Sequence, residues 1–205
     1  LHGEGHSFPT RRSSDLDATT TERARLGSDK LLIATTGATL ESDEVWRSAA
    51  TREAGVADAL EHWADEADGP VAAAFADAAT AAADRRDRIE ATPAEPDALS
   101  AHLQSAEGVA ERVGAGLVAA PLVLDRLYLQ VVSFFVNEAD AGSADVAREL
   151  RSGASDLGPA KAALAALDES GRERARDAAV EAVEVAYEEY ATALESMGLD
   201  PRPVC

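Results

Sequence analysis

The sequence is poor in cysteine, lysine and aromatic residues: among 205 residues it has one cysteine and two lysines, and 4% are aromatic. The single Cys205 excludes an internal disulfide and a CxxC metal knuckle. No histidine lies near it in sequence to activate it, which indicates a tail thiol rather than a nucleophile. No GxSxG, HExxH or glycine-rich phosphate loop occurs, so the sequence offers no catalytic motif of those classes.

Acidic residues dominate the charge, with 38 Asp and Glu against 19 Lys and Arg and a net charge of −19. High acidity with little lysine and small apolar side chains is typical of cytoplasmic proteins of halophiles, which stay soluble in molar salt. An ordinary acidic protein from a GC-rich genome is the alternative. Such a surface opposes binding to nucleic acid or anionic membrane, so we expect a protein partner, a second copy of the chain or a small molecule.

The N-terminal stretch SFPTRRSSDL, residues 7–16, does not fit the rest of the sequence. Its double arginine resembles the start of an export signal, but no apolar run follows it. The peptide looks like the translation of the end of a common short-read sequencing adapter. We therefore expect residues 1–16 to be non-native and disordered, and the natural chain to begin, already truncated, near Asp17.

Almost all of the remaining sequence has helical periodicity with breaks at glycine and proline, which predicts an all-α fold in a single domain, residues 17–205. Four long helices are predicted, with shorter helices around them. The long helices cover residues 42–67, 70–91, 107–136 and 172–197, and the short ones residues 17–26, 144–157 and 159–167; residues 31–37 form a packed connector.

The third long helix is apolar on nearly every side, and a kink is predicted at Pro121. Its length would suit a membrane span, but Asp125 and Arg126 lie at its centre and no basic residues flank it. We therefore expect the central helix of a bundle. The connection 92–106 is long enough for a crossover along the bundle, although a tight antiparallel turn is not excluded.

Three stretches, TREAGVADALEHWADEADG with AAAFADAA, QVVSFFVNEADA and AYEEYATALESMGLDPRPVC, resemble a haloarchaeal group of rubrerythrin-like proteins in the ferritin-like superfamily. The resemblance extends over most of residues 22–205. It implies a ferritin-like four-helix bundle with redox or peroxide chemistry at two irons. Such sites take one Glu from each of two helices and a Glu-x-x-His from each of the other two.

The ligand set that the resemblance implies is incomplete in this sequence. Helical spacing places Glu53 inside the apolar arc of its helix, where it matches the first-helix ligand, whereas His62 lies on the outer face. The Glu-x-x-His of the second helix would fall at Ala82 and Arg85, which cannot bind iron.

The remaining polar residues do not replace these ligands. Asp84 and Asp87 point away from the core and are expected to be solvated. The fourth helix has Tyr187 and Tyr190 in its inner stripe and only Glu184 near the edge. Outside residues 1–16 the histidines are His62 and His102, and neither has a ligand spacing.

We therefore expect a buried polar cluster instead of a metal site. In this cluster Glu53 pairs with Arg85 or Arg86, and Tyr187 or Tyr190 donates a hydrogen bond to it. A lone buried carboxylate would be costly, which is the reason for expecting a partner.

Three functions fit these patterns. The first is a ferritin-like protein with a degenerate di-iron site and no cofactor, acting through protein contacts. The second is a redox or peroxide-scavenging enzyme in which Glu53, Asp125 and Glu184 bind iron or manganese. The third is a transcription-related regulatory adaptor, for which no specific residue argues.

Overall fold

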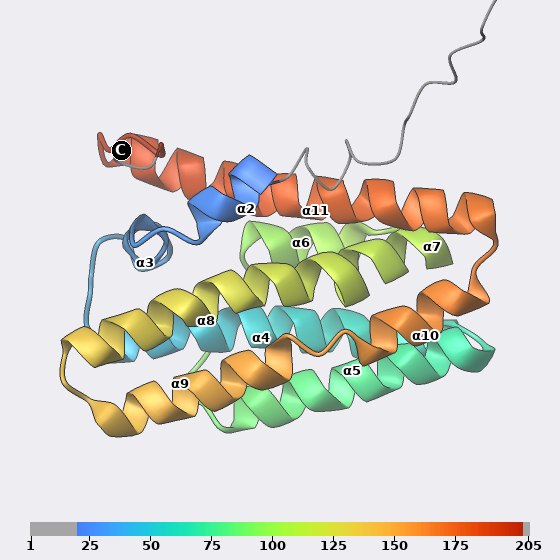
Figure 1. Ribbon diagram of the computed structural model, residues 1–205, viewed down its shortest axis with the longest axis horizontal. Helices are drawn as coiled ribbons and strands as arrows, with labels where there is room; N and C mark the ends of the chain where they lie inside the picture. Colours follow the sequence, from blue (N-terminus) through green and yellow to red (C-terminus); the bar gives the residue numbers. More distant parts are fainter. Residues whose placement is uncertain (1–19, 203–205) are drawn as a thin grey trace, which may run out of the picture.

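The computed structural model describes residues 20–202, so the predictions for residues 1–16 and for Cys205 lie outside the described residues. Every regular element between residues 20 and 202 is helical, and the predicted all-α class is confirmed for this part of the chain (Figure 1). The helices are α2 (Thr20–Leu26), α3 (Lys30–Thr35), α4 (Ser42–Glu66), α5 (Gly69–Asp87), α6 (Ala98–Ser105), α7 (Val109–Arg112), the π-helical segment η1 (Val113–Ala119), α8 (Ala120–Asn137), α9 (Ala141–Ala154), α10 (Gly158–Ala166) and α11 (Glu169–Ser196).

Several helices begin at an aspartate whose side chain accepts a hydrogen bond from a free backbone N–H of the first turn. Asp97, Asp140 and Asp168 cap α6, α9 and α11 in this way. Such caps stabilise a helix by about 1 kcal/mol. The cap at Asp97 starts α6, which the sequence analysis left inside a connection, and the packed connector around residue 31 is the short helix α3.

Helix α4 runs opposite to α8. The ring of Trp46, near its start, stacks on Phe135 near the end of α8 with centroids 4.9 Å apart. At its other end Glu66 accepts a hydrogen bond from Arg112 in α7, just before η1 and α8. Helix α5 follows α4 by a tight turn at Gly69 and is also antiparallel to it. Helices α5 and α8 are therefore parallel to each other.

The parallel arrangement of α5 and α8 requires a crossover, and α6 provides it (Figure 1). The sequence allowed either a crossover or a tight antiparallel turn for residues 92–106, and the structure has the crossover. Helix α6 lies so close to α4 that a Cβ on Gly55 would come within 1.9 Å of the Ser100 hydroxyl oxygen.

After α8 the chain returns through α9 and α10, and α11 runs back over the bundle (Figure 1). Helix α9 lies against α8, α10 lies against α5, and α11 lies mainly along η1 and α7. The fourth long helix of the prediction is thus parallel to α8, and the shorter α9 and α10 carry the chain in the direction of α4.

The predicted irregularity in the third long helix takes the form of η1, a π-helical segment of seven residues that ends just before Pro121. Proline has no amide hydrogen and crowds the preceding turn, which disturbs the regular α-helical hydrogen bonds. Within η1, Gly114 lies against α11: a Cβ there would be 1.7 Å from the carbonyl oxygen of Ala175.

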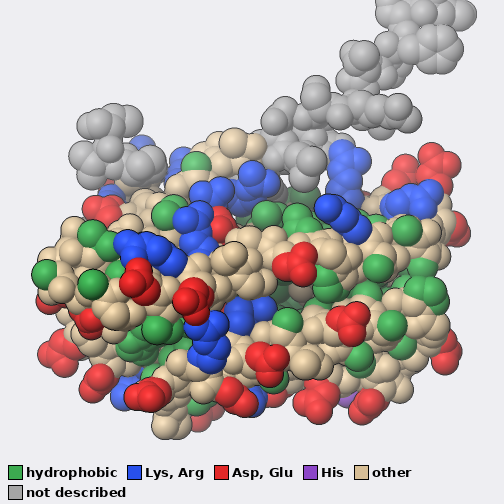
Figure 2. All heavy atoms as spheres, turned by 60° about the horizontal axis from the view of Figure 1, so that its bottom comes forward, with side chains coloured by type: hydrophobic (Ala, Val, Ile, Leu, Met, Phe, Trp, Pro, Cys, Tyr) green, Lys and Arg blue, Asp and Glu red, His purple; other side chains and the backbone are tan. Residues whose placement is uncertain are grey.

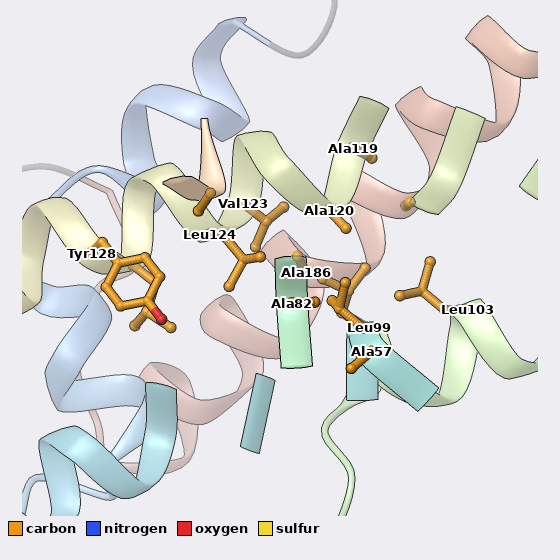
Figure 3. Packing of buried hydrophobic residues seen from close by; sticks show 14 of the residues in the cluster. Ala57, Ala82, Leu99, Leu103, Ala119, Ala120, Val123, Leu124, Tyr128 and Ala186 are labelled. Atoms are coloured by element: carbon orange, nitrogen blue, oxygen red, sulfur yellow. The ribbon is translucent and has the colours of Figure 1, made fainter. Parts of the chain in front are cut away.

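The core is built largely from alanine and leucine, which lets helix backbones approach closely. Figure 3 shows Ala57, Ala82, Ala120 and Ala186, contributed by α4, α5, α8 and α11, gathered in one region. Each of the four is at least 96% buried. Large side chains such as Trp63 fill the remaining space.

One helical run among the described residues, Val109–Asn137, is long and apolar enough to cross a membrane by length and composition. Half of its most apolar window is buried against other helices of the fold. The core helix of a soluble bundle has the same properties, so the run is weak support for a membrane span.

The close approach at Gly114 makes a prediction about stability. We expect Gly114→Ala to lower the free energy of unfolding by about 1 to 3 kcal/mol, because the new methyl group forces η1 away from α11. Urea unfolding followed by circular dichroism measures this. In the control Gly142→Ala, the added Cβ would lie 3.6 Å from the Asp140 carboxylate, an ordinary contact, so stability should change little or rise slightly. Equal stability of the two variants would contradict the described contact.

Candidate functional site

Glu53 lies at the centre of a buried ion pair that links α4 and α5. Its side chain is 0% exposed. Arg85 donates from Nε to Oε1 at 2.7 Å and from Nη2 to Oε2 at 2.9 Å, so both carboxylate oxygens are engaged by one guanidinium group. The Arg85 side chain is 12% exposed. This two-bond geometry is the strongest form of arginine–carboxylate pairing.

A tyrosine from α8 completes the site. The Tyr128 hydroxyl donates to Oε1 of Glu53 at 2.8 Å, and its ring is fully buried. Figure 3 shows this ring projecting from α8 into the interior of the bundle. The carboxylate therefore has three hydrogen bonds, and they come from two other helices, α5 and α8.

The environment of the pair changes the ionisation of its members. Burial raises the pKa of the Glu53 carboxyl, and the hydrogen bonds from Arg85 and Tyr128 act against this rise. Burial, reinforced by the nearby Glu53 charge, raises the pKa of Tyr128 well above that of an ordinary tyrosine. Tyr128 therefore keeps its proton and remains a hydrogen-bond donor.

The structure brings together Glu53 and Arg85, one of the two pairings considered from the sequence. Arg86 lies elsewhere and forms an ion pair with its neighbour Asp87 at 3.0 Å. The reason is helical geometry: successive residues point about 100° apart, so only one of the two arginines can face α4.

The two tyrosines expected beside Glu53 also lie elsewhere. The hydroxyl of Tyr187 accepts a hydrogen bond from Arg25 at 2.7 Å, and that of Tyr190 lies 3.1 Å from the Ser28 hydroxyl. Both partners belong to the α2–α3 region, which packs on α11. The expectation failed because α11 is covered by this segment, and the tyrosine that reaches Glu53 comes from α8.

The carboxylates considered as an alternative metal site do not converge. Asp125 accepts hydrogen bonds from Arg151 at 2.8 Å and from Ser155 at 3.2 Å. Glu184 is exposed on α11, and His62 is exposed and lies 3.5 Å from Glu66. Within residues 20–202, no three side chains of His, Cys, Asp or Glu come together in a geometry that could hold a metal ion.

The donor set around Glu53 therefore does not fit a di-iron centre. A di-iron site needs several carboxylates and imidazoles with free lone pairs. Both Glu53 oxygens accept hydrogen bonds, and the group nearest to them is a cation. A metal ion would have to displace the Arg85 guanidinium and would then face it at short range.

A second buried charge, Arg52, precedes Glu53 in the sequence and faces the other side of α4. Its side chain is 3% exposed. It donates from Nε to Asp97 at 2.5 Å and from Nη2 to Glu189 on α11 at 2.8 Å. Glu189 also accepts from the backbone N–H of Ala98 at 2.8 Å, which ties the start of α6 to α11.

Two of these residues, Tyr128 and Arg52, were missed in the sequence analysis. Arg52 falls within about 20° of Val45 on a helical wheel of 100° per residue, so an arginine in the apolar arc was a usable signal. Tyr128 lies in a helix that is apolar on all sides, where the wheel indicates no inner face. The only signal there was that a buried tyrosine hydroxyl needs a partner.

Comparisons with known proteins found no similarity to report: no protein-family model, no curated protein and no solved structure matched the chain. What the site can do chemically therefore has to follow from its own geometry. A carboxylate held by a guanidinium and a phenol is saturated, and neither a nucleophile nor a free general base results from the arrangement.

The ion pair predicts a large difference between two adjacent arginines. We expect Arg85→Met to lower the free energy of unfolding by about 3 to 5 kcal/mol, because it leaves the Glu53 carboxylate buried without a counter-charge. Arg86→Met is the matched control and should stay within about 0.5 kcal/mol of the parent, as for an exposed residue. Urea unfolding at neutral pH measures both.

The double variant Glu53→Leu with Arg85→Met gives a second check on the same pair. Removing both charges should recover most of the stability lost in Arg85→Met, because no charge then remains unpaired in the core. If Arg85→Met and Arg86→Met were equally mild, the interpretation of Glu53 as dependent on Arg85 would be wrong.

Proposed function

We propose that this chain is a ferritin-like protein whose di-iron position has been replaced by an ion pair, and that it acts through contacts with protein rather than through metal catalysis. The observation that carries the proposal is the occupation of both Glu53 oxygens by Arg85. In this proposal the bundle is a rigid scaffold, and its surface performs the function.

The saturation of the buried groups supports the non-catalytic part of the proposal. Redox work at a carboxylate-bridged metal needs open coordination positions. The groups nearest to Glu53 are instead a permanent cation and a hydrogen-bond donor, Arg85 and Tyr128. Nothing in this arrangement would release the carboxylate for a metal ion without leaving the buried guanidinium unpaired.

The surface supports contact with charged partners. Figure 2 shows acidic side chains spread over the visible face, with arginine and lysine between them and apolar side chains scattered. The exposed large apolar residues among those described lie on different elements: Leu40, Val109, Val136 and Leu199. With a net charge of −19, the chain would attract partners that carry positive patches.

The metal-free part of the proposal can be tested by loading. We expect the purified protein, incubated with excess Fe²⁺ or Mn²⁺ under anaerobic conditions and then desalted, to retain metal no better than its Glu53→Gln variant. Elemental analysis gives the stoichiometry, and peroxide consumption before and after loading gives the activity. Stoichiometric metal that disappears in Glu53→Gln would establish the alternative enzyme instead.

We also propose that the protein works in a cytoplasm of high salt, and the acidity gives this a test. Self-repulsion of the surface falls as the screening length drops from about 10 Å at 0.1 M salt to about 3 Å at 1 M. We expect Tm to rise by several degrees from 0.1 M to 2 M KCl, measured by circular dichroism. A Tm that stays constant or falls would contradict adaptation to salt.

A further inference from the structure

A pocket of about 390 Å³ lies on the side of α4 that faces away from the Glu53 pair. It is bounded by α3, α4, the segment before α6, and α11, with one residue of α8. Pockets of this size hold small organic molecules. Part of the lining is apolar, here called the apolar wall: Leu31, Leu127, Ala186 and Ala193.

The lining also contains the buried Arg52 network. One guanidinium group is shared there by two carboxylates, those of Asp97 and Glu189, so this part of the lining carries one negative charge in excess. Nε and Nη2 of Arg52 make these two bonds, so Nη1 is the guanidinium nitrogen that remains for a ligand. A ligand oxygen at this point would accept a hydrogen bond from Nη1, strengthened by the charge of the guanidinium group.

The rim adds further negative charge. Glu44 and Arg47 line the pocket and form an ion pair with each other, so together they are neutral. Glu95 also lines the pocket and is exposed. The lining therefore has four carboxylates and two guanidinium groups, which leaves two negative charges in excess.

The charges and the apolar wall together define the ligand. An anion would be repelled by the excess carboxylates and by the net charge of the whole chain. A bare metal ion would leave the apolar wall without a contact. An organic cation would place its nitrogen near the carboxylates and its carbon skeleton on the apolar wall.

We propose that this pocket binds a small organic cation that carries an oxygen acceptor beside its charged nitrogen, as an amino-acid amide does. The ammonium group binds at Glu189 and Glu95, the oxygen accepts from Nη1 of Arg52, and the carbon skeleton lies on Leu31 and Ala193. This goes beyond the protein-contact function proposed above and does not depend on it, because the pocket and the Glu53 pair lie on different sides of α4.

Three probes of similar shape test the proposal on the full chain: phenylalaninamide, phenethylamine, which lacks the amide oxygen, and 3-phenylpropanamide, which lacks the charge. Titrations followed by NMR at one fixed ionic strength give Kd and the residues that respond. We expect phenylalaninamide to bind at one site, phenethylamine to bind several-fold more weakly, and 3-phenylpropanamide at least ten-fold more weakly. Equal binding of the charged and uncharged amides, or no binding of phenylalaninamide, would overturn the proposal.

Paired variants locate the site. Ala193→Phe fills the pocket and should abolish binding of phenylalaninamide, whereas Thr192→Phe, exposed on the same helix, should not. Glu95→Gln should weaken binding several-fold, and Glu90→Gln, exposed in the same segment but outside the pocket, should leave it unchanged. Circular dichroism confirms that each variant is folded. Binding that survives Ala193→Phe in a folded protein would show that the cation binds elsewhere on the acidic surface and would overturn the assignment.

Discussion

The fold depends on how the buried charge of Glu53 is compensated. A carboxylate that is 0% exposed cannot remain unpaired, and its partners come from two other helices, α5 and α8. A buried pair of this kind adds little stability compared with apolar residues, but losing one partner is costly. The pair therefore fixes the positions of α5 and α8 along α4. A shift of either helix by one turn, about 5.4 Å, would separate the donor from the acceptor.

Helix α4 carries two adjacent buried charges that point to different sides, and this divides the interior. On one side Glu53 and Arg85 form a neutral pair closed off by Tyr128. On the other side Arg52 is shared between two acids next to a pocket. The closed side links three helices, whereas the side of Arg52 has excess negative charge and a pocket. The same helix thus places the structural ion pair and the proposed binding pocket on different sides.

Much of the fold could be predicted from helical periodicity, because alanine-rich helices with glycine and proline breaks have clear ends. The inward position of Glu53 followed from the same periodicity, and so did the choice of Arg85 or Arg86 as its partner. The rest could not be predicted. Tyr128 lies in a helix without a polar face, and the covering of Tyr187 and Tyr190 by α2 and α3 depends on tertiary packing. The direction of α11 depends on the crossover at α6, which the length of the connection allowed but did not require.

The use of arginine at Glu53 is consistent with the charge of the whole chain. A protein with a net charge of −19 attracts cations to its carboxylates. A buried carboxylate without a partner would bind a metal ion that could reach it. A guanidinium group prevents this, because it donates hydrogen bonds to both carboxylate oxygens at once and stays charged at any physiological pH. Lysine would engage one oxygen as a point charge, and histidine would lose its charge near neutral pH. The pairing with Arg85 thus leaves neither Glu53 oxygen open to an exchangeable cation, and the organic cation proposed above would bind at the separate pocket beside Arg52.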